Sequence, residues 1–521
     1  MVAHHISDPD TALDIIQRGL QSISLQTDEA GPDSSFSARI PIELLQDIFR
    51  IGLDLFPAVH GSVAPLLYGQ VCRRWREVAH STPELWSSIH VAVPLTVTAK
   101  DRADALISKN SILSDLVASW LARADERPLR ISLFSKATSV DDQITRFLAD
   151  FLSRISGYFG QCTYLRFSLP LECLNFMTSN KEEMSMLETV ILFNLSMPAF
   201  FSPPTVNPGA LATLTLAPKL RNLSLSSPPD GPFRPTANWA SLSTLALDVS
   251  DDDTFGPSEA LNILAECPRL QSFTLVMTCL TWRWRDTITW PAPLTLPALT
   301  KLRVDVIYYH FLDFLSHIVV PAIRDLSVAI LKPLSRDSTW RVFNILRPTV
   351  QSTKLDTLKL TAIGSLDYNI NPGLGHSIRS LLEAVPSLSS LTLNMGSKMI
   401  HEEVLTALTL KDSTPLPLCP DLVQVEFPDA NASIGKLTDK LLESFLLSRL
   451  NPPEPVAQLR RFISPLKPSS SCTATLKEFD GRVEVGTPSV PSDTIARPRS
   501  YNSPFASVPV SLDPTTLDPY V

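Results

Sequence analysis

The clearest pattern of apolar and polar positions in this chain is a six-residue segment of the form L-x-x-L-x-L. Nine such segments occur, starting at Leu187, Leu220, Leu242, Leu270, Leu299, Ile323, Leu355, Leu388 and Leu422. Alternation with a period of two residues predicts short strands with one buried side. Between Leu220 and Leu422 the segments start 22 to 34 residues apart, by subtraction of positions, and a proline often stands two residues before the first leucine.

Helical spacing of apolar residues separates several of these predicted strands. The helical stretches are A-L-N-I-L-A before Leu270, F-L-D-F-L before Ile323 and S-I-R-S-L-L before Leu388. A strand and a helix that recur in this way are typical of a leucine-rich-repeat solenoid, although the regular asparagine of such repeats is missing. The alternative is an ordinary α/β domain with leucine-rich strands. We favour the solenoid because nine copies at this spacing rarely arise by chance.

The N-terminal part of the chain has helical periodicity instead. Residues 12–26 predict a short amphipathic helix, and residues 28–37 form a polar linker. Pro41 opens a further helix with Glu43 in its first turn, and both residue types are favoured there. The apolar residues on one face of this helix are Ile42, Leu45, Ile48 and Phe49. A second helix is predicted over residues 67–79, and a final L-W pair closes a small core.

The order of these motifs, I-P-I-E-L-L-Q-D-I-F, then V-C-R-R-W, then L-W, resembles an F-box. With the repeats that follow, the chain resembles fungal F-box/leucine-rich-repeat proteins over some 450 residues. The resemblance implies docking to the linker subunit of an SCF-type cullin-RING ubiquitin ligase. The residues that match the docking motif are Pro41, Leu44, Leu45, Ile48, Phe49, Val71, Cys72 and Trp75, of which Trp75 is the one we expect to be structural.

Two features depart from the family pattern. Ile40 stands where a leucine is usual, and residues 50–66 make a longer link between the two helices than a minimal F-box has. The alternative to an F-box is a helical hairpin whose apolar residues form only its own core. That alternative does not account for the whole ordered series of motifs followed by a repeat array.

These patterns predict an α/β chain with a small all-helical F-box followed by an irregular leucine-rich-repeat solenoid. The expected divisions are an N-terminal helix and linker (1–35), the F-box (36–90), a helical connector (91–130), the solenoid (131–450) and a tail (451–521). The connector contains a helix over 107–123, and a strand-like run begins at residue 127. The tail is rich in proline and serine and is expected to be largely disordered, apart from one short strand near residues 475–485.

Composition argues against a nucleic-acid-binding, disulfide-rich or membrane-spanning protein. Only 19% of the residues are charged and the net charge is −8, so no global field attracts nucleic acid or an anionic membrane. The seven cysteines form no C-x-x-C pair, which favours reduced thiols over a disulfide framework. We find no secretory leader and no long apolar span, so an intracellular, cytoplasmic or nuclear location is expected.

The sequence shows no motif for catalysis. The nine histidines are scattered, and H-E-E-V at His401 lacks the second histidine that a zinc-binding helix needs. No nucleophile elbow and no phosphate-binding loop occurs. We therefore expect no catalytic residues, no metal and no cofactor.

The favoured function is a substrate-recognition adaptor that promotes ubiquitin-dependent degradation of an unknown protein target. The alternative is a non-catalytic F-box scaffold that does not promote ubiquitination. The third and fifth positions of each L-x-x-L-x-L strand point away from the leucines and are expected to bind the target. The expected binding residues are Ser272, Thr274, Lys301, Arg303, Asp325, Thr357 and Lys359, and their cationic members predict an acidic or phosphorylated ligand.

Overall fold

The structure is a computed structural model, and it divides into two compact units, Met1–Asn238 and Trp239–Val521. The described residues are 40–93, 103–135, 142–169, 173–174, 184–194, 208–226, 237–249, 256–277, 292–307, 309–331, 336–351, 353–362, 374–394, 398–410, 417–428, 439–450, 452–463 and 484–486. The helix predicted over 12–26 and most of the tail lie outside them.

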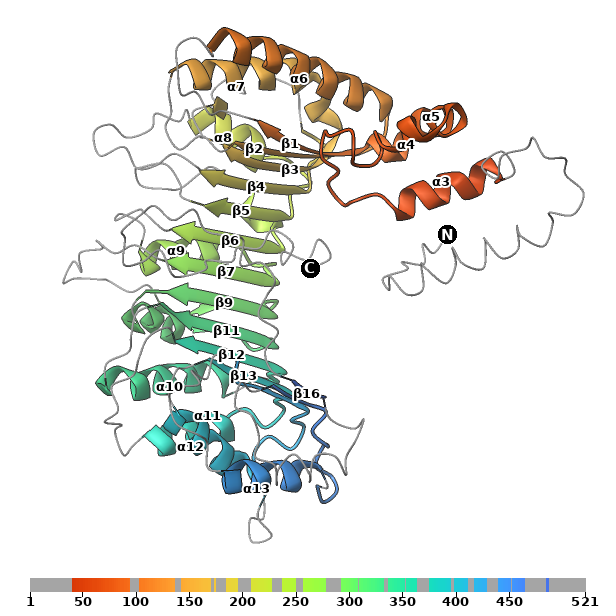
Figure 1. Ribbon diagram of the computed structural model, residues 1–521. Helices are drawn as coiled ribbons and strands as arrows, with labels where there is room; N and C mark the ends of the chain where they lie inside the picture. The colour runs from red at the N-terminus through yellow and green to blue at the C-terminus, as the bar shows by residue number, and fades with distance from the viewer. Residues whose placement is uncertain are drawn as a thin grey trace, which may run out of the picture. The chain divides into compact units, whose positions relative to one another are not determined.

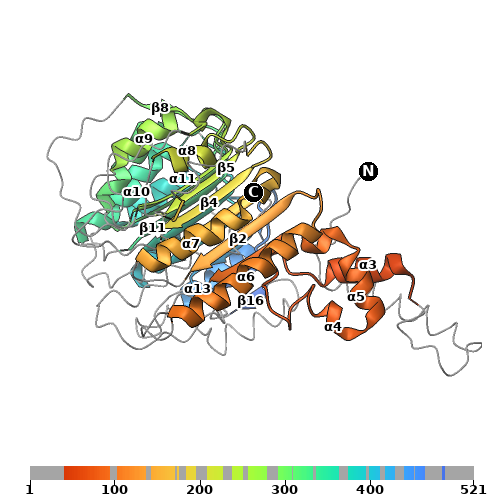
Figure 2. The ribbon, with the colours of Figure 1, turned by 90° about the horizontal axis from the view of Figure 1, so that it is seen from above.

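The first unit is a helical segment followed by five parallel strands. Its elements are α3 (Ile42–Ile51), α4 (Tyr68–Val71), α5 (Arg73–His80), η2 (Pro83–Trp86), β1 (Ser88–Val93), α6 (Ala103–Arg123), β2 (Leu129–Ser135), α7 (Asp142–Ile155), η4 (Ser156–Gln161), β3 (Cys162–Leu169), β4 (Thr189–Asn194), α8 (Pro208–Thr215) and β5 (Asn222–Ser226). Each strand pairs in parallel with the strand before it. Helices α6 and α7 lie side by side on one side of the strands (Figure 1, Figure 2).

The second unit repeats the same plan. Its elements are η6 (Trp239–Ser241), β6 (Thr244–Val249), α9 (Pro257–Ala265), β7 (Ser272–Met277), β8 (Leu294–Thr295), β9 (Lys301–Val306), η7 (Tyr309–His317), β10 (Ile318–Val319), β11 (Asp325–Ile330), α10 (Arg336–Val350), β12 (Thr357–Ala362), α11 (Leu374–Glu383), β13 (Ser390–Asn394), α12 (Lys398–Leu408), β14 (Gln424–Glu426), α13 (Asp439–Leu450), β15 (Arg461–Ile463) and β16 (Glu484–Gly486). Apart from the small β8–β10 pair, these strands are parallel neighbours in chain order. The fold is therefore mixed α/β with extensive parallel pairing, which is compatible with a solenoid-like arrangement.

All nine predicted strands are confirmed, and each begins two residues after the first leucine of its segment. The fourth and sixth positions are buried, as Leu245 and Leu247 are in β6. The third and fifth positions of β6, β7 and β11 are half-buried instead. A period of two residues places these two sets on opposite faces of the sheet. The apolar face is covered by the intervening helices, and its leucines form the core.

The prolines that precede many segments sit in a recurring turn. At Leu270 the backbone N–H donates to the carbonyl oxygen of Cys267 at 3.2 Å, with Pro268 as the second residue of the turn. The same bond closes the turns that contain Pro218, Pro297, Pro321, Pro386 and Pro420. Proline is favoured at this position because its fixed φ matches the first central residue of a β-turn. The turn therefore ends the connection that precedes each of these strands and directs the chain into the strand.

The predicted domain boundaries differ from the structure at both ends of the array. Strand β1 already occupies Ser88–Val93 and pairs with β2, so an all-helical domain ending at residue 90 is not seen. Residues 91–130 contain the expected helix, but as a helix between two paired strands. At the other end, β15 and β16 continue the pairing beyond residue 450. Strand β16 overlaps the short strand expected near residues 475–485. Strands β1 and β15 were missed because Trp86, Ile89 and Val91 replace the leucines of the pattern in W-S-S-I-H-V, as Phe462 does in L-R-R-F.

Candidate functional site

Helix α3 has two apolar faces, one buried and one exposed. Pro41 is its N-cap, Glu43 lies in the first turn and Arg50 in the last turn, as the helix dipole favours. Leu45 and Phe49 are fully buried. Leu44 is 45% exposed and Ile51 42% exposed, and both lie on the face of α3 that also contains Pro41 and Ile48, because residues three and four apart share a helix face.

The predicted second helix is broken in two at Cys72. This residue has an extended backbone (φ −158°, ψ 171°), and its sulfur accepts a hydrogen bond from the backbone N–H of Trp75 at 3.5 Å. It therefore caps α5 and separates it from α4. The break turns Val71 outward, where it is 54% exposed, while Trp75 stays half-buried.

An aromatic cluster holds the three helices together. The rings of Phe49 and Tyr68 stack with centroids 4.1 Å apart, and Trp75 meets Phe49 edge-on at 5.0 Å. The Tyr68 hydroxyl donates to the Phe49 carbonyl oxygen at 3.2 Å. Arg74 of α5 donates to the Ile40 carbonyl oxygen at 2.5 Å. This packing agrees with the expectation that Trp75 is structural, and it places Leu45 and Phe49 in the core of the helical segment.

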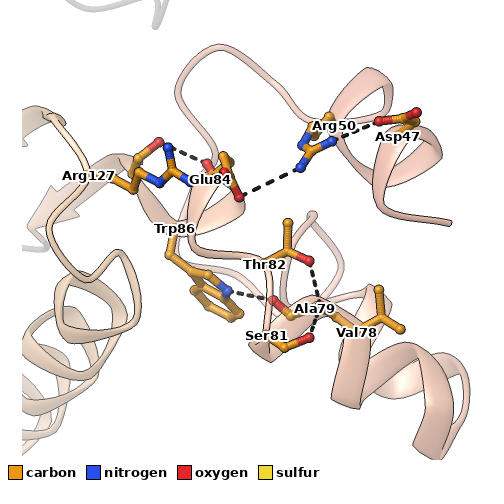
Figure 3. Close-up of polar contacts among 10 residues, drawn as sticks. Asp47, Arg50, Val78, Ala79, Ser81, Thr82, Glu84, Trp86 and Arg127 are labelled. Atoms are coloured by element: carbon orange, nitrogen blue, oxygen red, sulfur yellow. Dashed lines mark hydrogen bonds and ion pairs between the residues drawn. The ribbon is translucent and has the colours of Figure 1, made fainter. Parts of the chain in front are cut away.

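The end of the helical segment is closed by the hydrogen bonds in Figure 3. The indole N–H of Trp86 donates to the Ala79 carbonyl oxygen at 2.8 Å, and the Thr82 hydroxyl donates to the Val78 carbonyl oxygen at 2.7 Å. These bonds satisfy carbonyl groups that the end of α5 leaves without helical partners. They fix the L-W pair on the last turn of that helix.

Glu84 connects the helical segment to the residues that follow α6. Figure 3 shows it between two arginines, with one carboxylate oxygen 2.6 Å from the Arg127 guanidinium and the other 3.8 Å from that of Arg50. Trp86 also meets Trp120 of α6 edge-on at 5.0 Å, with the Arg123 guanidinium 4.7 Å from its ring centroid. Within the first unit, the helical segment is thus packed onto the first helix of the array.

The long link over residues 50–66 covers the edge of β1. The Ser88 hydroxyl donates to the Leu55 carbonyl oxygen at 2.6 Å, and the His90 N–H donates to that of Pro57 at 2.9 Å. Ala58 forms a parallel bridge with His90. An exposed strand edge is a site for unwanted pairing, and a covering loop prevents it. The length of this link therefore has a structural use.

Exposed apolar side chains concentrate in this part of the chain. Among the described residues, ten large apolar side chains are exposed, and six of them lie between residues 42 and 71. These six are Ile42, Leu44, Ile51, Leu55, Leu67 and Val71. Single exposed apolar residues are ordinary, and it is a contiguous patch of them that marks an interaction surface. We call these six residues the apolar strip.

The predicted docking residues divide into three groups. Pro41, Leu44 and Val71 are exposed, Ile48, Cys72 and Trp75 are half-buried, and Leu45 and Phe49 are buried. The buried pair contributes to the core and is not accessible to a partner. Ile42, Ile51, Leu55 and Leu67 are exposed members that the motif did not indicate. Ile42 and Ile51 lie at the two ends of α3, and Leu55 and Leu67 lie outside the helices, so helical periodicity did not mark these four residues as exposed.

The predicted target-binding residues of the second unit lie in two rows across the strands. Ser272, Lys301, Asp325 and Thr357 are consecutive register partners in one row, and Thr274, Arg303, Ser327 and Lys359 are consecutive partners in the next. Arg303 is paired with Asp305 of the same strand, with the guanidinium and carboxylate 2.7 Å apart. Lys301 has Asp325 beside it in the register. Two of the three expected cationic residues, Lys301 and Arg303, therefore have a carboxylate next to them.

Histidine, cysteine and acidic side chains are scattered among the described residues. No cluster of three or more histidine, cysteine or acidic residues occurs among them. Burial raises the pKa of Cys267 to about 12 and also raises that of Cys162, so these thiols are not activated nucleophiles. Within the same residues, no helix combines the length and the apolar character needed to cross a membrane.

Comparisons with known proteins assign no family. No family model matches the chain, and no curated protein matches it. Among solved structures, a protein from Bacteroides fragilis matches with a TM-score of 0.21 and 10% identity, over 79% of this chain and 76% of that protein. A similarity this low supports no argument about function.

Proposed function

We propose that this chain is a substrate-recognition adaptor of a cullin-RING ubiquitin ligase. The segment from α3 to η2 acts as an F-box that docks on the linker subunit, and the strands that follow form a degenerate leucine-rich-repeat array that holds a target protein. The apolar strip is the single observation that carries this proposal. A helical segment with a filled aromatic core has no internal need for six further exposed apolar side chains.

The architecture supports the same proposal. The motif that resembles an F-box precedes a series of parallel strands, each of which presents polar positions on one face and leucines on the other. Arrays of this kind offer an extended surface for a protein ligand. The close packing of Trp86 on Trp120 would transmit the position of the docked helices to the first strands of the array.

An adaptor of this kind needs no catalytic residue. It brings lysines of the target close to the charged ubiquitin-conjugating enzyme, and proximity alone then accelerates the transfer. This mechanism requires a rigid connection between the docking helices and the target-binding strands. The Glu84 ion pairs and the Trp86 contacts supply such a connection within the first unit.

The proposal is tested by co-purification of the full chain with the cullin linker subunit. Leu44→Asp/Val71→Asp places two charges on the apolar strip without touching the buried core, and we expect it to abolish co-purification. The matched control is Leu216→Asp/Leu447→Asp, because those leucines are 47% and 41% exposed in other parts of the chain. Equal retention of the linker subunit by both double variants, or none by the wild type, contradicts the docking role.

A further inference from the structure

Three basic side chains come together where helices α5 and α6 end. Arg76 and His80 are four residues apart on α5, so they share one face of that helix, and Arg123 lies in the last turn of α6. The buried ring of Trp86 contacts both helix ends. Its centroid is 5.8 Å from that of the His80 ring and 4.7 Å from the Arg123 guanidinium. We call Arg76, His80 and Arg123 the cationic cluster.

The cationic cluster has no carboxylate partner among the described residues. Four acidic residues lie close to it in the sequence. Glu77 and Glu84 pair with arginines outside the cluster, at 2.9 and 2.6 Å. Asp125 and Glu126 follow Arg123 and are exposed, but within the described part of the chain they form no ion pair with it. The positive charge of the cluster is therefore not neutralised by a neighbouring carboxylate.

The side chains of the cluster are held in place and remain accessible. Arg76 donates from Nε to the Gly69 carbonyl oxygen at 2.6 Å, and this bond does not use its two terminal nitrogens. Arg123 lies over the Trp86 ring, a contact that leaves guanidinium N–H groups available as donors. Arg76 and His80 are exposed and Arg123 is half-buried, so a ligand can reach all three.

The protonation of His80 reports the local charge. A histidine in the last turn of a helix is stabilised in its protonated form by the helix dipole, and this effect raises its pKa. The pKa of His80 is lowered instead, first by partial burial and then by the positive charges of Arg123 and Arg76. The electrostatic potential at this surface is therefore positive, and an anion from another molecule would stabilise all three groups.

We propose that the cationic cluster binds an acidic segment of a protein partner, with carboxylates of the segment contacting Arg76, Arg123 and a protonated His80. A guanidinium binds a carboxylate through two parallel hydrogen bonds, which favours arginine in such a site. Gly69, which holds Arg76, belongs to the same short helix as Val71 of the apolar strip. A protein can use apolar and acidic contacts together, so this position favours a protein over a nucleic acid. The inference does not require the proposed function, because it concerns the chemistry of the ligand and not a ligase.

The test is fluorescence anisotropy of the full chain with a rhodamine-labelled hexaglutamate peptide. Arg76→Gln/Arg123→Gln should bind the peptide at least about tenfold more weakly, because two charge-assisted contacts are lost. The matched control is Lys354→Gln/Lys359→Gln, which removes two exposed cations from the second unit. It should bind within about twofold of the wild type, as expected for cations outside the site. Equal losses in the two double variants would mean unspecific attraction and would overturn the inference.

His80 gives the site a pH dependence of known sign. A bound carboxylate raises the pKa of His80, so binding takes up a proton and the affinity for hexaglutamate increases as the pH falls. Between about pH 7.5 and pH 5.5 the peptide stays largely ionised, and we expect a gain of at least about threefold. His80→Gln should remove most of this gain and bind like the wild type at the higher pH. The exposed His80 ring forms no hydrogen bond with a described residue, so this variant is expected to fold.

Three further outcomes would overturn the inference. They are absence of hexaglutamate binding by the wild type, unchanged binding by Arg76→Gln/Arg123→Gln, and the same pH dependence after His80→Gln. Binding of labelled oligouridine in place of hexaglutamate would identify a nucleic-acid surface instead. If the double variant does not fold, Arg76→Gln alone must still weaken binding, since that side chain is exposed. Because no linker subunit is present, a failure here leaves the docking proposal untouched.

Discussion

Neighbouring residues of α3 have opposite roles. Leu44 is exposed and Leu45 is buried, because consecutive positions on a helix point about 100° apart. The docking motif includes both residues, so the sequence predicted the helix and its apolar content but not this division. The stacking of Phe49 on Tyr68 and the burial of Leu45 show which face of α3 is turned inward.

Trp86 connects three parts of the first unit through one side chain. It donates to the Ala79 carbonyl oxygen, meets Trp120 edge-on and carries Arg123 over its ring. The L-W motif predicted a closing role for this residue, and its burial confirms that role. Its contacts with α6 could not be predicted, because 34 residues separate Trp86 from Trp120, by subtraction of positions.

Trp86→Ala should lower the free energy of unfolding by about 3–5 kcal/mol, because a large buried side chain leaves a cavity. Trp86→Phe should cost about 1–3 kcal/mol, since the Ala79 carbonyl then loses its indole donor and keeps only weaker backbone donors such as the Thr82 N–H at 3.4 Å. Thermal unfolding followed by circular dichroism measures both. Ser81→Ala is the control, because its hydroxyl bonds the Val78 carbonyl at an exposed position. A loss for Trp86→Phe no larger than that of the control would contradict the role of the indole N–H.

At the scale of single elements, the strands were the most predictable part of the chain. Their leucines alternate with polar residues, and a buried apolar face fixes the register. The helical stretch before Ile323 forms η7, a 3₁₀ helix, although an α-helix was the expectation. The split between α4 and α5 was also missed, because the extended backbone of Cys72 leaves no mark in the apolar pattern.

The turn before β4 offers a test of the proline turns. The Leu187 N–H donates to the Met184 carbonyl oxygen at 3.2 Å, as in the proline turns, but Ser185 stands where those have proline. Ser185→Pro should raise the free energy of unfolding by about 0.4–1 kcal/mol by restricting the unfolded chain. Ser185→Ala is the control in the same melting experiment and should show no gain. A loss of stability on Ser185→Pro would mean that this turn differs from the others.

Helix α13 is tied to the array by one buried arginine. The Arg449 guanidinium donates to the carbonyl oxygens of Leu408, Leu418 and Cys419 at 3.0, 2.6 and 3.0 Å. Burial lowers its pKa to about 10, so it remains protonated at neutral pH. The sequence predicted the helix but not this contact, because its acceptors are backbone atoms of distant turns.

Arg449→Met should therefore lower the free energy of unfolding by about 2–5 kcal/mol, since three carbonyl groups, two of them on buried residues, lose the guanidinium donor. The control is Arg379→Met, which removes only an exposed pair with Glu383 at 3.2 Å and should cost less than about 0.5 kcal/mol. Differential scanning calorimetry of the full chain compares the two variants. Similar melting temperatures for both would show that the three hydrogen bonds contribute no stability.

At the scale of the whole chain, the sequence predicted the order of a helical segment and a strand array but misplaced the boundary between them. Trp86, Ile89 and Val91 are as fully buried as the leucines of the other segments, so β1 pairs with β2 although it lacks the leucine pattern. Removal of residues 36–90 would therefore delete part of a paired strand. Surface substitutions on the apolar strip are the cleaner test of docking.

The most direct test of the docking proposal is isothermal titration calorimetry of the full chain with the purified linker subunit at several temperatures. One-to-one binding with a negative heat-capacity change is the expected result, because burial of apolar surface produces that sign. Leu44→Asp should abolish the heat of binding, and Leu216→Asp, at 47% exposure against 45%, should leave it unchanged. Absence of binding by the wild type, or identical isotherms for the two variants, would contradict an adaptor that docks through α3 and α4.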